Sequence, residues 1–263
     1  MSLPKVSVVK YLNTVPLIWG MLKGKQQGKY HLDFTTPAAC ADALRRSEAD
    51  LGIIPSIEYQ RIGHLAVLPG LSIASKNQVK SVLLVSKTPI SQVQTVAADT
   101  SSRTSVALLD ILLRKFYSLN VRMTPAAPNP REMLERSDAA LIIGDPALAL
   151  NGQAPQIYDL AAEWKKFTGL PFVFAVWAGR EGAEISRYRD DFEASRDYGL
   201  AHMDDIAQEY GPKVSMTPEA VKVYLTENID YSLDDENLEG LRLFYRLAHE
   251  LGLVSQAQEL CFA

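Results

Sequence analysis

Cysteine and clustered histidine are both scarce in this sequence. Only two cysteines, Cys40 and Cys261, occur among the 263 residues. Two thiols cannot build a disulfide framework or, by themselves, a structural zinc site. The four histidines are scattered and lack the i, i+4 spacing that is typical of metal ligands on one helix. We therefore predict a site without a metal ion.

Glycine-rich phosphate loops and long apolar runs are also missing. Neither GxGxxG nor GxxxxGK[ST] occurs, so we predict no nucleotide cofactor. No stretch approaches the roughly 20 apolar residues that span a bilayer. The first ten residues contain no apolar signal-peptide segment and no cleavage site, which predicts a cytoplasmic protein. With 31 acidic against 27 basic residues, no basic face for nucleic acid or an anionic membrane is expected.

What remains is the composition of an ordinary globular protein, with 47% hydrophobic and 22% charged residues. The first half of the chain alternates short β-branched runs with amphipathic segments, which predicts βαβ units and largely parallel sheets. After residue 184 the pattern becomes helical. Strands are expected at 5–9, 31–34, 50–55, 82–86, 93–97, 139–143, 158–160 and 172–177. Helices are expected at 16–22, 38–47, 56–61, 106–116, 186–198, 203–210, 218–227 and 234–251.

This order of elements resembles the two-lobed type II periplasmic-binding-protein fold, an α/β fold in which mixed, mostly parallel sheets are flanked by helices. We predict that residues 1–88 and 175–263 form one lobe and residues 89–174 the other. Ligands of open α/β sheets bind at the carboxyl ends of the strands, here in the cleft between lobes. The loops expected to face that cleft are 11–16, 55–59, 86–87, 100–105 and 144–146.

The richest of these loops reads DTSSRTS at 99–105. Its hydroxyls and one arginine lie where a strand ends and a helix begins. The N–H groups at a helix start bind anions, and an arginine adds a planar fork that matches a carboxylate. The loop therefore predicts a carboxylate-binding site, although a single Ser or Thr could equally serve as the helix N-cap.

Three further strand-end residues are candidates with a structural alternative. Asn13 can orient a hydroxyl or hold a carboxylate, or it can cap a helix. Ser56 lies outside any GxSxG elbow, so we expect it to donate a hydrogen bond to a ligand rather than to act as a nucleophile. Asp145 can be a general base or orient a hydroxyl, but an Asp before Pro also starts turns.

Four motifs in order carry a resemblance to one family. Residues 10–17 read KYLNTVPL, 54–59 read IPSIEY, 99–105 read DTSSRTS and 144–147 read GDPA. Together they are similar to those of the chorismate dehydratases of menaquinone biosynthesis. The resemblance covers residues 5–180 and extends only loosely into the helical tail.

The resemblance implies a hydro-lyase that converts chorismate, a small dicarboxylate, to 3-[(1-carboxyvinyl)oxy]benzoate without metal or cofactor. It implies that Asn13 is catalytic and that the substrate's own carboxylate takes the proton, with Asp145 as the alternative base. The substrate-binding residues expected are Tyr11, Ser56, Ser86, Ser101, Ser102, Arg103, Thr104, Ser105 and Asp145.

Two other functions are compatible with this fold. A 1,4-dihydroxy-6-naphthoate synthase would have a Ser/Pro-rich first loop and a catalytic His, and neither is found here. A solute-binding protein would accept the same small carboxylates without turnover. The sequence says nothing about the oligomeric state.

Overall fold

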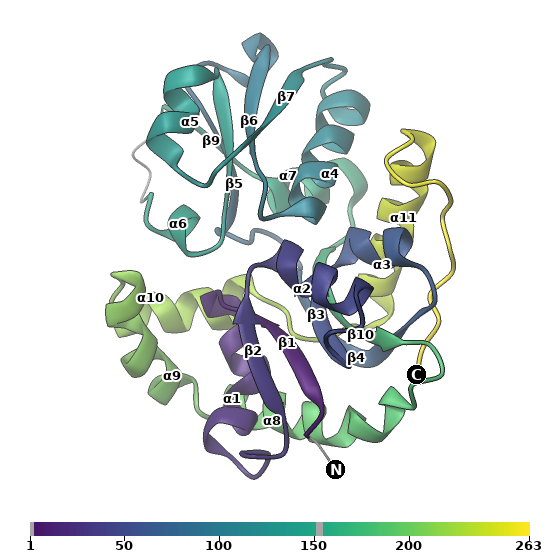
Figure 1. Cartoon of the computed structure of the whole chain (residues 1–263). Coiled ribbons are helices and arrows are strands. Elements are labelled where there is room, and N and C mark those ends of the chain that lie inside the picture. The colour runs from purple at the N-terminus through teal and green to yellow at the C-terminus, as the bar shows by residue number, and fades with distance from the viewer. Residues whose placement is uncertain (1–2, 151–154) are drawn as a thin grey trace.

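Two five-stranded sheets, each flanked by helices, make up the protein. The structure is a computed structural model that describes residues 3–150 and 155–263. In Figure 1 the second sheet lies above the first, α8, α9 and α10 (residues 189–223) lie along the lower part of the molecule, and α11 (Asp235–Glu250) stands at the right beside both parts. We call the part built on each sheet the first and the second lobe.

The first sheet has the strand order β2-β1-β3-β10-β4. β1 pairs in parallel with β2 and β3, whereas β10 runs antiparallel to both β3 and β4. β3 and all but the first residue of β1 are buried, as expected for strands covered on both faces, whereas the edge strand β2 is largely exposed. The bounds are β1 (Lys5–Val9), β2 (His31–Thr35), β3 (Leu51–Pro55), β4 (Leu65–Ser75) and β10 (Phe172–Arg180).

The second sheet has the strand order β7-β6-β8-β5-β9. β6 pairs in parallel with β7 and β8, and β5 runs antiparallel to β8 and β9. The carboxyl ends of β6 and β8 therefore meet the start of β5 at one edge of the sheet. The bounds are β5 (Val82–Ser86), β6 (Thr95–Asp99), β7 (Arg122–Ala126), β8 (Ala139–Ile143) and β9 (Gln156–Asp159).

Helices begin where a side-chain oxygen can accept a backbone N–H. Thr36, Asn129 and Asp159 each cap a helix in this way, and a proline follows the first two caps. The helices are α1 (Val15–Lys23), α2 (Pro37–Arg45), α3 (Ser56–Ile62), α4 (Arg103–Ile111), α5 (Pro130–Arg136), α6 (Asp145–Leu148), α7 (Leu160–Thr168), α8 (Arg189–Ala201), α9 (Met203–Tyr210), α10 (Pro218–Val223) and α11 (Asp235–Glu250). π-Helical turns extend α4 over Leu112–Phe116 and α10 over Tyr224–Asn228.

The predicted alternation of strands and helices is confirmed, with five elements missed: β4, β7, α5, α6 and α7. β4 carries Pro69-Gly70 in its middle, and β7 contains Pro125; both are turn signals. Each lies at a sheet edge, where a proline is tolerated because one side of the strand needs no partner.

Two strands depart from the predicted division of the chain. Residues 1–88 were expected in the first lobe, but β5 pairs entirely within the second sheet. β10 likewise joins the first sheet from Phe172, before the predicted boundary at residue 175. The chain thus crosses between sheets just before β5 and again after α7.

The C-terminal helix α11 contacts both lobes. It packs against β10 and α3 of the first lobe and against α4 of the second. Beneath it, the ring of Phe172 makes edge-to-face contacts with Trp164 and Phe244, with centroids 5.3 and 5.0 Å apart. The Trp164 indole N–H donates to the Pro171 carbonyl at 3.0 Å. The aromatic core therefore supports the cleft from behind.

Candidate functional site

A pocket lies between the lobes at the carboxyl ends of β1, β3, β6 and β8. The empty space between its walls, counting the part that is open to solvent, is about 520 Å³. Its apolar walls include Val9, Ile73, Val79, Val82, Ile143 and Phe174. Its polar side chains are Tyr11, Asn13, Ser81, Ser102, Thr104 and Ser105. Among the described residues that line it, none is a carboxylate, lysine, arginine or histidine.

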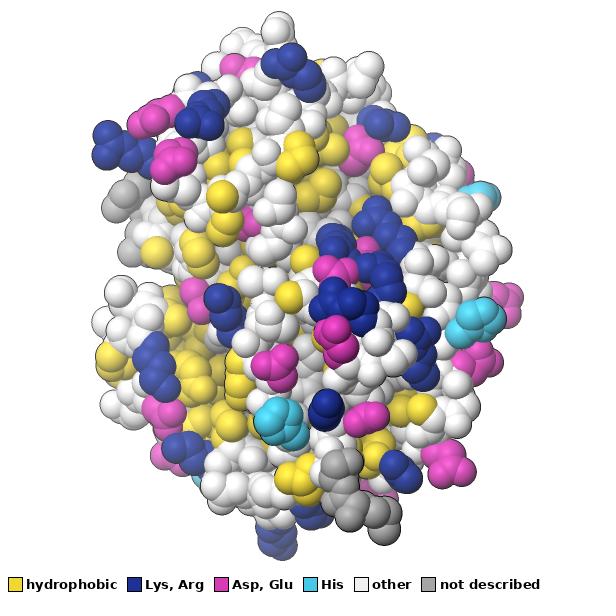
Figure 2. Space-filling view, viewed as in Figure 1, with side chains coloured by type: hydrophobic (Ala, Val, Ile, Leu, Met, Phe, Trp, Pro, Cys, Tyr) yellow, Lys and Arg dark blue, Asp and Glu magenta, His cyan; other side chains and the backbone are white. Residues whose placement is uncertain are grey.

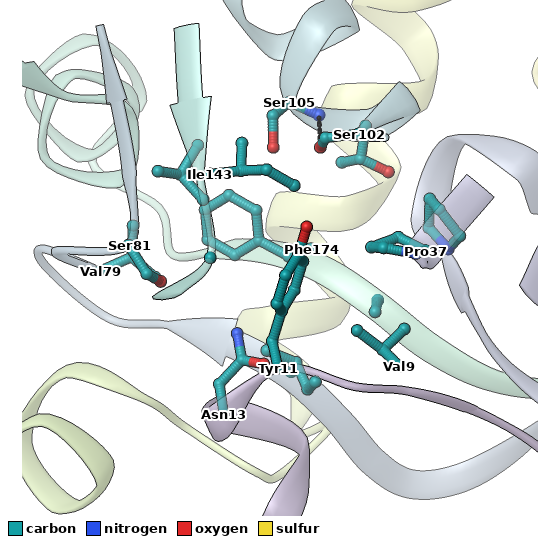
Figure 3. Close-up of a pocket in the computed structure, with 16 residues that line it drawn as sticks. Val9, Tyr11, Asn13, Pro37, Val79, Ser81, Ser102, Ser105, Ile143 and Phe174 are labelled. Atoms are coloured by element: carbon teal, nitrogen blue, oxygen red, sulfur yellow. Dashed lines mark hydrogen bonds between the residues drawn. The ribbon is translucent and has the colours of Figure 1, made fainter. Parts of the chain in front are cut away.

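One wall of the pocket is the start of α4. The Ser102 side chain accepts from the Ser105 N–H at 3.3 Å, so Ser102 caps the helix. Within the described part of the chain, the N–H groups of Arg103 and Thr104 have no acceptor. Figure 3 shows Ser102 and Ser105 at this wall. The predicted cap is confirmed, and because one hydroxyl satisfies one N–H, the cap leaves other N–H groups available to an anion.

The facing wall holds Asn13 and Ser81. In Figure 3 the Asn13 amide nitrogen and the Ser81 oxygen both point toward the interior of the pocket. Asn13 lies in a short helical turn, Leu12–Thr14, where its side chain makes no cap hydrogen bond. The capping alternative for Asn13 is therefore wrong. Its amide oxygen accepts from the Thr14 hydroxyl at 3.4 Å, and its amide nitrogen faces the pocket.

Tyr11 stands between these walls. Its hydroxyl lies 3.4 Å from Ser101 Oγ, which in turn donates to Asp99 Oδ1 at 2.7 Å. Its ring fits against Gly144, whose φ of +67° and missing side chain allow the approach. Ser101 therefore supports Tyr11 rather than lining the pocket.

Two carboxyl groups, the buried Asp99 and the half-buried Asp145, lie just outside the pocket. Burial raises the pKa of Asp99, although hydrogen bonds from Ser101 lower it. Burial also raises the pKa of Asp145, against the lowering effect of the Leu12 N–H, which donates to Asp145 Oδ1 at 3.1 Å. The pKa of the Tyr11 phenol is raised by burial and by both acids. Asp145 joins the lobes by binding the loop after β1.

The predicted role of Ser86 in substrate binding is wrong. Ser86 is buried, and its hydroxyl donates to the Thr88 carbonyl at 2.7 Å. The reason is the direction of β5: Val82 pairs with Ile143 near the pocket, whereas Ser86 pairs with Ala139 at the opposite edge of the sheet. The predicted cleft loop 86–87 lies there too.

Arg103 does not offer its guanidinium to the pocket as predicted. Nη1 and Nη2 contact the two Asp42 oxygens at 3.0 and 2.9 Å, and Nη1 contacts Glu58 Oε2 at 2.8 Å. Glu58 is 1% exposed and also binds Arg45 and Arg61. Figure 2 shows these basic side chains gathered around acidic ones over α2 and α3. The Arg103 guanidinium is therefore bound by Asp42 and Glu58 and is not available to a ligand.

Ser56 and Thr104 meet at the seam between lobes. Ser56 is fully buried, and its hydroxyl donates to the Val173 carbonyl at 2.8 Å, so it does not reach the pocket as predicted. Thr104 Oγ1 accepts from the Ile57 N–H at 3.2 Å and also lines the pocket.

Ser81 is the polar residue of the pocket that the sequence analysis did not predict. We expected ligand contacts at the carboxyl ends of strands, and Ser81 lies immediately before the start of β5. No local pattern reveals that β5 is antiparallel, and only that direction brings its start to the cleft.

The described residues contain neither a cluster suited to a metal ion nor a membrane-spanning helix. They hold no group of three or more His, Cys, Asp or Glu side chains arranged to bind a metal ion. Nor do residues 3–150 and 155–263 include a helix long and apolar enough to cross a membrane.

Comparison with known proteins identifies the family. Residues 4–250 match the family model described as menaquinone biosynthesis. A chorismate dehydratase of Thermus thermophilus is 30% identical, and the alignment covers 93% of each chain. One of Campylobacter jejuni is 26% identical, covering 93% of this chain and 97% of the other.

A solved structure confirms the predicted fold class. The periplasmic aliphatic sulphonate binding protein of Escherichia coli superposes with a TM-score of 0.62 at 14% identity, covering 98% of this chain and 90% of that one. At this identity the likeness establishes the fold alone. The family, by contrast, follows from the sequence matches: because the model spans nearly all residues and a relative reaches 30% identity over almost its whole length, this chain belongs to the menaquinone biosynthesis family.

Proposed function

We propose that this protein is a chorismate dehydratase, which converts chorismate to 3-[(1-carboxyvinyl)oxy]benzoate and water. Two chorismate dehydratases are relatives over nearly the whole chain. The observation that carries the proposal is the pocket itself, which combines N–H and hydroxyl donors with apolar walls and, among its described lining residues, no charged side chain. Such a pocket suits a ring compound that carries carboxylates, one of which can itself act as the base.

The substrate's shape fits the two polar walls. Chorismate carries a ring carboxylate and, at the opposite end of the ring, the hydroxyl that leaves. We place the carboxylate at the start of α4, where the N–H groups of Arg103 and Thr104 and the hydroxyls of Ser102 and Ser105 can donate to it. The leaving hydroxyl then faces Asn13 and Ser81. Apolar residues enclose the ring between them.

Elimination then needs a base and a stabilised charge. A proton leaves the ring carbon that bears the ether, its electron pair forms the new ring double bond, and the carbon–oxygen bond to the hydroxyl breaks. We propose that the substrate's enolpyruvyl carboxylate takes this proton and that the departing hydroxide becomes water with it. Asp145, the alternative base, is turned away toward the Leu12 N–H.

The protein's own contribution is position and electrostatics. N–H donors at α4 stabilise the negative charge that spreads into the ring carboxylate, and Asn13 holds the reacting groups together. Closure of the two lobes excludes water and prevents rearrangement of the enolpyruvyl ether. Cytoplasmic location, independence of metal and cofactor, and absence of a nucleic-acid partner stay predictions of the sequence.

The test is direct. Purified protein is incubated with chorismate in the presence of a chelator, and the ring products are followed by chromatography against a blank without protein. We expect the benzoate product, and in Asn13→Ala a loss in kcat of about 100-fold or more with little change in affinity. Asn120→Ala, at an exposed position outside the pocket, is the matched control.

Other outcomes separate the alternatives. Equal losses of affinity and turnover in Asn13→Ala contradict its catalytic role. Tight binding of chorismate without turnover points to a solute-binding protein. No binding at all points to a different substrate, such as that of the 1,4-dihydroxy-6-naphthoate synthases.

A further inference from the structure

Behind the Asn13 wall of the pocket lies a tyrosine from the helical tail. Tyr224 begins the π-helical turn after α10, and its side chain is 2% exposed. Its hydroxyl donates to Ser81 Oγ at 2.9 Å. Ser81, the residue immediately before β5, is fully buried and lines the pocket. A residue far along the chain thus reaches the back of the site.

This hydrogen bond decides what the Ser81 hydroxyl can do. Its oxygen accepts from Tyr224, so its own hydrogen must point elsewhere. Within the described residues, Ser81 Oγ donates to no acceptor. The open direction is the pocket, toward which the oxygen points in Figure 3. Ser81 is therefore presented as a donor to whatever lies beside Asn13.

The backbone around Ser81 is equally constrained. The Ser81 carbonyl accepts from the Gly144 N–H at 2.7 Å. Burial raises the pKa of the Tyr224 phenol, and the neighbouring side chains of Ser81 and Asn13 act in the opposite direction. Tyr224 thus contacts or adjoins both polar residues of this wall, and it does so without itself lining the pocket.

We propose that Tyr224 is a positioning residue of the dehydration: it holds the Ser81 hydroxyl so that its hydrogen is donated to the departing hydroxyl of the substrate. This inference rests on the proposed function and deepens it. No proton is transferred in this role, since Ser81 donates a hydrogen bond that strengthens as negative charge develops on the leaving oxygen. Without Tyr224 the hydroxyl rotor can turn away.

The experiment compares Tyr224→Phe, Ser81→Ala and the double variant. Phe keeps the buried ring and removes only the donor. We expect Tyr224→Phe to lower kcat about fivefold to tenfold with KM changed less than about twofold. Because Tyr224 acts through Ser81, the double variant should be no slower than Ser81→Ala alone.

Tyr231→Phe is the matched control. Tyr231 is a buried tyrosine of the same tail, and its hydroxyl has no hydrogen-bond partner among the described residues. Its loss should leave kcat unchanged. Unfolding midpoints of all variants are measured alongside. Wild-type kcat in Tyr224→Phe, or losses that multiply in the double variant, would overturn the inference.

The same variants distinguish a failure of the proposed reaction from a failure of the positioning role of Tyr224. If the wild type binds chorismate without turnover, the proposed reaction fails, and the same comparison is made on dissociation constants. Weaker binding by Tyr224→Phe that disappears on the Ser81→Ala background then supports the positioning role, and unchanged binding refutes it. If the wild type neither binds nor converts chorismate, both proposals fall.

Discussion

At the residue scale, the contact between Tyr11 and Gly144 sets the geometry of the pocket. A Cβ at position 144 would lie 2.8 Å from two atoms of the Tyr11 ring, closer than real contacts allow. The φ of +67° adds strain for any other residue. The glycine is thus required twice, by backbone conformation and by the close approach of a side chain from the other lobe.

This predicts the outcome of Gly144→Ala. Backbone strain should cost about 1 kcal/mol, and displacement of Tyr11 should lower kcat/KM as well. Gly28→Ala is the control, because Gly28 has φ +78° and nothing within 4 Å of the added Cβ. Denaturant unfolding and steady-state kinetics are compared. If both variants lose the same unfolding free energy and keep full activity, the contact between Tyr11 and Gly144 does not contribute to activity.

At the element scale, α4 does two tasks at once. Its N-terminus is capped by Ser102 and opens into the pocket, so the same residue stabilises the helix and faces the ligand. Arg103, the next residue, faces the other way and joins α4 to α2 and α3. The two side chains can have different roles because successive residues point in directions about 100° apart around the helix axis.

Ser102→Ala should therefore differ from loss of an ordinary cap. Removal of the cap is expected to cost about 1 kcal/mol of unfolding free energy, and KM for the anionic substrate should rise. Thr217→Ala removes the equivalent cap of α10, outside the pocket. It should cost similar stability and leave KM unchanged. A KM shift shared by both variants would show that stability alone is responsible.

At the scale of the whole molecule, several contacts join the two lobes. The Leu12 N–H reaches Asp145, the Ala38 N–H reaches the Ser101 carbonyl at 3.2 Å, and Arg103 binds Asp42 and Glu58. The Arg103 guanidinium holds the pKa of Asp42 below its usual value. These contacts all join the two lobes, and the ion pairs lie outside the pocket itself.

Arg103→Met should favour an open arrangement. Glu58 keeps Arg45 and Arg61, so the fold is expected to persist while the link to α4 is lost. We predict a larger radius of gyration without ligand, by small-angle scattering, and a higher KM. Arg61→Met removes the same charge, but within α3, and should change neither. An unchanged radius in Arg103→Met would show that the ion pairs do not hold the cleft closed.

The sequence by itself determined the elements, the fold class and the family. Local patterns of β-branched runs, caps and prolines specify strands and helices, and four loop motifs with specific residues identify the relatives. The sequence also placed Asn13 and the start of α4 at the site correctly, because the carboxyl ends of parallel strands gather at one edge.

Only the tertiary structure decided the direction of β5, the partners of Arg103 and the reach of Tyr224. The direction of a strand depends on which neighbours it pairs with, and this reversed the prediction for Ser86 and brought Ser81 to the pocket. The acids that bind Arg103 and the tail that supplies Tyr224 are distant in sequence. Such contacts leave no local pattern, because they arise from packing between elements that the chain brings together only on folding.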